Sequence, residues 1–99
     1  MTVRPKLLTE TERAEALAGL AGWTYQPEKQ LLYKQFMFKT FGEAWAFMSQ
    51  SALMAEKLDH HPDWSNSYNR VTVSLTTHDV GGVTQLDVSL ASAMNAFFK

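Results

Sequence analysis

The sequence contains no cysteine, no long apolar run and no excess of one charge. Without cysteine there is no disulfide framework, no thiolate nucleophile and no cysteine-based zinc site. The formal net charge is -1 with both signs interspersed, which argues against direct, phosphate-dominated binding of nucleic acid. No apolar run follows Met1 to Lys6, so we expect no signal peptide, no transmembrane segment and no membrane partner. These absences favour a soluble cytoplasmic protein.

The chain has enough apolar residues for one core. Its 99 residues, of which 45% are hydrophobic, suit a single domain spanning 1–99. Three helix starts share the capping-box pattern Thr-x-x-acid, at Thr9, Thr40 and Thr84. They predict helices over about 10–21, 41–59 and 85–98.

Alternating segments between these helices predict strands. In 69–77, Val71, Val73 and Leu75 alternate with polar residues, as in a half-buried strand. Segments 23–25 and 31–38 predict a hairpin. A further strand over 64–68, or a bend in the long strand, stays open. The order predicts an α+β fold: a single two-layer domain with an antiparallel β-sheet of about four strands and three helices on one face.

The long helix carries two apolar stripes. The first consists of Phe41, Trp45, Met48, Ala52 and Ala55, and the second of Phe47, Ser51, Met54 and Leu58. One interpretation is a broad core face, since core stripes are often wide. The other is that the second stripe binds another subunit, which predicts an oligomer.

Two of the three histidines stand side by side just before Pro62. The residue before a proline is disfavoured in the α region, so a helix must end near here. If the helix extends to Asp59 or His60, then Glu56 and His60 share one face and His61 points elsewhere. Imidazole titrates near neutral pH, so the arrangement suits proton transfer. The structural alternative is a capped, solvated helix end.

Other candidate residues have ordinary structural explanations when taken singly. His78 ends a strand and enters a turn, where polar residues collect. Asp87 is the acid of a capping box and should accept a hydrogen bond from the Thr84 amide. Trp23 and Trp64 would ordinarily be core residues.

The spacing of the whole set is more specific than any of its members. It comprises Glu56-x-x-x-His60-His61-Pro62-x-Trp64-x-Asn66-x-Tyr68, then Val71, Val73, Leu75 and Thr77-His78, then Gly82-Val83-Thr84-x-x-Asp87. Further matching segments are Gly22-Trp23, Lys34-Gln35-Phe36-x-Phe38, Phe47-Met48 and Leu90-Ala91-Ser92. Over nearly the full chain this pattern closely resembles the pterin-4a-carbinolamine dehydratase family, also named in animals as a dimerisation cofactor of a homeodomain transcription factor.

The resemblance implies a dehydratase that removes water from 4a-hydroxytetrahydropterin to give quinonoid dihydropterin. This reaction supports tetrahydrobiopterin recycling after aromatic amino acid hydroxylation. No redox change occurs, so neither a flavin, a nicotinamide nor a metal cofactor is implied. The catalytic positions fall on His60, His61 and His78, with His61 as the base at the ring nitrogen and His60 or His78 as the acid toward the hydroxyl.

Other residues are expected to assist these histidines. Glu56 would hold His60 and favour its charged form, and Asp87 would orient His78 or the pterin. The candidates to bind the amino-pyrimidine edge are Asp59, Thr77 and Asp79, and Trp23 is the candidate to cover the ring face. The implied partners are the pterin substrate, further copies of the chain in a homodimer or homotetramer, and a protein partner.

Two other functions stay open on sequence alone. Three histidines with Asp or Glu supply enough ligands for a hydrolytic zinc site. Alternatively, the domain is a protein-binding adaptor or transcriptional dimerisation cofactor with an incidental pterin pocket. Three imidazoles poised for proton transfer argue against an adaptor alone, although both roles are compatible in one protein.

Overall fold

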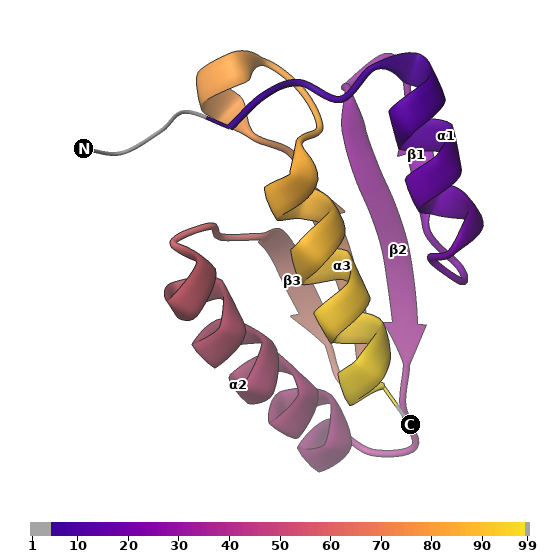
Figure 1. Cartoon of the computed structure of the whole chain (residues 1–99). Coiled ribbons are helices and arrows are strands. Elements are labelled where there is room, and N and C mark those ends of the chain that lie inside the picture. Colours follow the sequence, from indigo (N-terminus) through magenta and orange to yellow (C-terminus); the bar gives the residue numbers. More distant parts are fainter. Residues whose placement is uncertain (1–4, 99) are drawn as a thin grey trace.

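A four-stranded antiparallel sheet forms one layer of the molecule, and three α-helices cover one of its faces (Figure 1). The computed structural model describes residues 5–98, so residues 1–4 and 99 of the expected domain lie outside the described residues. The elements are α1 (Glu10–Ala18), β1 (Thr24–Gln26), β2 (Leu31–Met37), α2 (Phe41–Leu58), β3 (Asp63–Ser67), β4 (Arg70–Leu75), the 3-10 turn η1 (His78–Val80) and α3 (Gln85–Phe97). The predicted α+β fold is confirmed.

The order of strands in the sheet is β1-β2-β4-β3. The strand that the sequence left open is present as β3, at one edge of the sheet. In the central β4 the apolar residues Val71, Val73 and Leu75 are fully buried, as their alternation predicts. Asp63 of β3 pairs with Ser74 of β4 in antiparallel register. The residues that precede β3 therefore lie beside those that follow β4.

All three predicted helix starts are confirmed, but their caps differ. Thr9 and Thr84 form reciprocal capping boxes. At α2 the Thr40 hydroxyl accepts from the Glu43 amide, whereas the Glu43 carboxylate accepts from Lys39 N at 3.1 Å. Helix α1 ends at Ala18, before the predicted residue 21.

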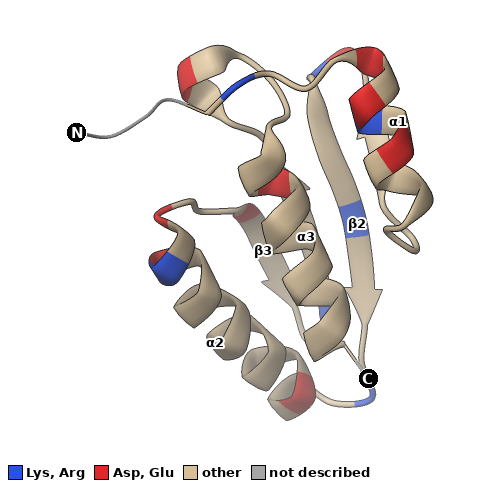
Figure 2. Cartoon of the chain, viewed as in Figure 1, with Lys and Arg blue, Asp and Glu red and all other residues tan. Residues whose placement is uncertain are grey.

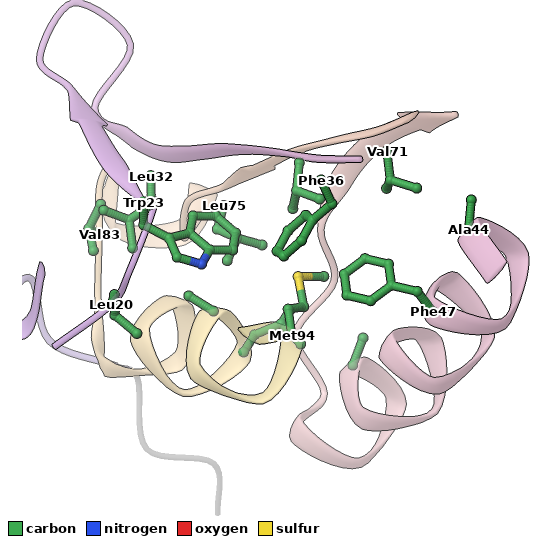
Figure 3. Close-up of a cluster of buried hydrophobic side chains, with 14 residues drawn as sticks. Leu20, Trp23, Leu32, Phe36, Ala44, Phe47, Val71, Leu75, Val83 and Met94 are labelled. Carbon is green, nitrogen blue, oxygen red and sulfur yellow. The ribbon is translucent and has the colours of Figure 1, made fainter. Parts of the chain in front are cut away.

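The prediction that the second stripe of α2 faces another subunit is wrong for its central residues. Phe47 is only 2% exposed and Ser51 is fully buried, so both face the core of the subunit. Figure 3 shows Phe47 beside Phe36 and Met94, between the sheet and the helices. Two aromatic side chains of the first stripe are exposed instead, Phe41 at 48% and Trp45 at 57%. The helix is rotated so that Ala44, Phe47, Ser51 and Ala55 form its buried face.

Candidate active site

His60 and His61 follow the C-terminus of α2, and their side chains point in different directions. Asp59 takes the left-handed conformation (φ 51°), and the following amide, His60 N, donates to Ala55 O at 3.0 Å. Asp59 N also donates to Glu56 O at 3.1 Å, which completes a Schellman motif. Because the helix ends at Leu58, His60 turns inward and is buried, whereas the His61 side chain remains 59% exposed.

His60 is paired with Asp87, the first charged residue of α3. His60 Nε2 lies 2.5 Å from Asp87 Oδ1. The other oxygen, Oδ2, accepts from Thr77 Oγ1 at 2.8 Å and from Thr84 N at 2.9 Å. Asp87 is fully buried, and a buried carboxylate needs such donors to offset its lost hydration. In Figure 2 it is the red segment of α3, which carries no other charged residue.

These contacts correct two predicted pairings. Glu56 does not hold His60; its Oε1 lies 2.8 Å from His61 Nε2. Glu56 and His60 would share a face only if the helix continued to residue 60, and it does not. Asp87 pairs with His60 rather than with His78. Its predicted bond to the Thr84 amide is confirmed.

His78 begins η1, directly beyond Thr77 and the end of β4. Its Nε2 lies 3.5 Å from Asp63 Oδ2, the first residue of β3. Asp63 was missed by the sequence analysis because nothing in the motif indicates that β3 and β4 begin and end side by side. Each of the three histidines thus has a carboxylate within ion-pair distance.

One small hollow brings most of the predicted site residues together. It has a volume of about 210 Å³ and is lined by Asp59, His60, His61, Thr76, Thr77, His78 and Asp79. His60 is among the lining residues, and its Nε2 is paired with Asp87. A larger hollow of about 550 Å³ lies against α2 and the end of α3, but no histidine lines it. The smaller hollow is therefore the better candidate for a site of proton transfer.

Trp23 does not join this group. It is 5% exposed, packs edge-on against Phe36, and donates from Nε1 to Asn95 Oδ1 at 3.0 Å. Asn95 lies eight residues after Asp87, which is about 12 Å along α3. The same carbonyl oxygen accepts from Lys34 Nζ at 2.8 Å, and burial lowers the pKa of Lys34. The indole therefore belongs to the core at the other end of α3.

Two negative findings hold for the described residues. Within 5–98, no group of three or more His, Asp or Glu side chains is placed to hold a metal ion, so the geometry offers no support for the zinc alternative there. In the same part of the chain, no helix is long and apolar enough to cross a membrane.

Comparison with known proteins points to one family. Residues 6–97 match the family model described as pterin 4 alpha carbinolamine dehydratase. A protein of Bradyrhizobium diazoefficiens with the provisional name pterin-4-alpha-carbinolamine dehydratase is 52% identical over 93% of this chain and 92% of its own length. A similarly named protein of Brucella ovis is 53% identical over 90% of this chain and 92% of its own length.

Solved structures agree with this match. The crystal structure of a transcriptional coactivator/pterin dehydratase from Brucella melitensis superposes with a TM-score of 0.92 at 50% identity, covering 95% of this chain and all of that one. A pterin dehydratase-like protein identified as a RuBisCO assembly factor in the alpha-carboxysome has a TM-score of 0.66 at 22% identity, over 77% of this chain and 88% of its own. The second likeness shows a shared fold alone.

Proposed function

Since the chain belongs to the pterin-4-alpha-carbinolamine dehydratase family and is a dehydratase, we propose that the hollow between α2, β4 and η1 binds the pterin and that its histidines move the protons. The observation that carries this proposal is the convergence of three imidazoles, each beside a carboxylate, on one hollow. The product would return to the tetrahydrobiopterin pool after aromatic amino acid hydroxylation.

The reaction needs two proton transfers and no change of oxidation state. The C4a–O bond breaks, and the departing hydroxyl takes a proton to become water. The neighbouring ring nitrogen loses a proton, and its electron pair forms the C=N bond of the quinonoid product. One acid and one base balance these steps, and each such group typically contributes about 10²–10⁴-fold.

The surroundings of each histidine support different roles. His61, exposed and paired with Glu56, is the proposed base at the ring nitrogen. His60, held by buried Asp87, and His78, beside Asp63, are the proposed acids toward the hydroxyl. All three side chains line the hollow. Because two acids are available, the assignment between them rests on the kinetics of single variants.

Recognition of the amino-pyrimidine edge falls to the carboxylates of the hollow. Asp59 and Asp79 line it and are exposed. This position supports them as the proposed acceptors for the amino group and the adjacent N–H. Thr77 is different, because its hydroxyl proton is donated to Asp87. We therefore propose that Thr77 shapes the floor of the hollow and leaves the edge to the two aspartates.

Replacing the two exposed histidines tests this function. His61→Ala and His78→Ala should each lower kcat for a freshly generated 4a-hydroxypterin by roughly one to three orders of magnitude. Their unfolding midpoints should stay close to wild type, because both side chains are more than half exposed. The rate is followed by ultraviolet absorbance against a protein-free control. Wild-type rates in both variants would place the catalytic groups elsewhere.

Self-association is the second part of the proposal. Phe41, Trp45 and Leu53 project from α2 with 48%, 57% and 74% of their surface exposed. The rings of Phe41 and Trp45 stack with centroids 6.3 Å apart. An apolar surface of this kind favours an interface. A symmetric homo-oligomer would use it twice, and a separate protein partner would compete for it.

The interface test uses exposed residues only. Trp45→Glu combined with Leu53→Lys should shrink the particle to about the mass of one chain, 11.2 kDa, without loss of helix content. The control is Phe47→Ala, which should instead destabilise the subunit by about 3–5 kcal/mol, since Phe47 is buried. Light scattering coupled to size exclusion gives the masses. A wild-type mass of one chain would refute self-association.

A further inference from the structure

The hydrogen bonds behind Asp87 have a single possible direction. Thr77 Oγ1 donates its only proton to Asp87 Oδ2 at 2.8 Å. The Thr84 hydroxyl lies 2.8 Å from Thr77 Oγ1. Since the Thr77 proton is already used, Thr84 must be the donor in that pair. The result is a directed chain of donors from Thr84 through Thr77 to Asp87 Oδ2. The other oxygen of the same carboxylate, Oδ1, pairs with His60 Nε2.

Thr84 itself is anchored from behind. It is fully buried, and its Oγ1 accepts from Leu86 N at 3.2 Å as part of the cap of α3. Its amide donates to Asp87 Oδ2 at 2.9 Å. Thr84 therefore fixes the Asp87 carboxylate directly through its amide and indirectly through its hydroxyl.

Thr84 does not line the hollow, so it is not expected to contact the substrate. The side chains that line the hollow include Thr77 and His60 but not Thr84. Any influence of the Thr84 hydroxyl on the reaction must pass through Thr77 and Asp87 to the imidazole.

We propose that Thr84 and Thr77 are positioning residues for the dehydration: their hydroxyl chain fixes Asp87 as an acceptor, and Asp87 thereby fixes the orientation of the His60 ring at the hollow. This proposal rests on the proposed function. It assigns two roles to the Thr84 hydroxyl, which caps the N-terminus of α3 and helps to orient the His60 imidazole.

The chain offers a matched pair of variants at each threonine. Thr84→Val keeps the shape and removes the hydroxyl, and Thr84→Ser keeps the hydroxyl. Val should lower kcat about fivefold, the equivalent of one hydrogen bond, with KM unchanged because Thr84 does not line the hollow. Ser should restore kcat. Thr77→Val and Thr77→Ser should repeat this contrast with the Thr84 cap intact, and they carry the test if Thr84→Val does not fold.

A helix-cap control separates positioning from stability. Thr9 has the same capping box at α1 and an exposed acid, Glu12. Thr9→Val should lower the unfolding midpoint but leave kcat of the folded protein unchanged. If it lowers kcat as much as Thr84→Val does, the effect is one of stability and the proposal is overturned.

Coupling to His60 supplies the decisive measurement. In a His60→Ala background, Thr84→Val should cause no further fall in kcat. The nuclear magnetic resonance signal of the His60 Nε2 proton should move in Thr84→Val and stay in place in Thr9→Val. An active wild type with an unchanged Thr84→Val rate, or with additive losses in the double variant, overturns this proposal alone. If the wild-type protein is inactive, the proposed function is overturned. The signal of the His60 Nε2 proton in Thr84→Val then still tests whether the hydrogen-bond chain exists.

Discussion

Helices α1 and α3 begin with the same capping box, but only the box of α3 contacts a histidine of the proposed site. At α1, Thr9 N donates to Glu12 at 2.8 Å, and at α3, Thr84 N donates to Asp87 at 2.9 Å. The pattern and the backbone bond are alike. Glu12 is exposed, however, whereas Asp87 is fully buried and adds contacts to Thr77 and His60.

The difference lies in what surrounds the carboxylate. At α1 the backbone hydrogen bond with Thr9 lowers the pKa of Glu12, and water meets the rest of the group. At α3 water is excluded, so protein donors must satisfy every lone pair that the cap leaves over. One of these donors is an imidazole of the hollow. A local motif thus positions an acid, and burial decides whether the acid has a further role.

The largest expected difference between the two caps is in stability, when Asp87 or Glu12 is replaced by alanine. Asp87→Ala leaves His60, Thr77 and the Thr84 amide without their acceptor and should cost about 3–5 kcal/mol of unfolding free energy. Glu12→Ala loses an exposed cap contact and should change stability far less. Urea unfolding of both variants measures the contrast. Equal losses would mean that burial of Asp87 adds nothing to its cap role.

The corrected pairing of Glu56 predicts an intermediate effect. Glu56→Gln removes the charge beside His61 but keeps a hydrogen-bonding side chain, so kcat should fall about threefold to tenfold, the equivalent of a weakened contact to a charged group. In a His61→Ala background the same change should have no effect on kcat. If the loss persists there, Glu56 acts through another group.

The smallest effect concerns pH and α1. The pKa of Glu12 is lowered in the folded state, so its contribution to stability is present above the unfolded pKa. It is lost as the pH falls through the folded pKa. Glu12→Gln should therefore slightly flatten the acid limb of stability against pH, while kcat keeps its wild-type value. An unchanged limb would show that the α1 cap does not depend on the charge.

The sequence predicted the fold, and most of the candidate site residues it named line one hollow. It predicted only part of the contacts between them. Capping boxes and alternating strands depend on local spacing, so they could be found without a structure. The Glu56–His61 pair depends on Asp59 adopting a left-handed conformation, which favours glycine and has no signal here. The approach of Asp63 to His78 depends on strand register, which no local pattern gives. The hydrogen bond from Trp23 to Asn95 joins residues far apart in the sequence, so it too has no local signal.

The most direct test of the account is the dehydration rate of Asp87→Asn beside Glu12→Gln and wild type. The substitution keeps the shape of each acid and removes its charge. We predict that wild type and Glu12→Gln consume freshly generated 4a-hydroxypterin equally fast. Asp87→Asn should be slower by roughly 10- to 100-fold in kcat, the equivalent of a charged hydrogen bond. Equal kcat in Asp87→Asn and Glu12→Gln, with both variants folded, would contradict the claim that the buried cap of α3 serves catalysis.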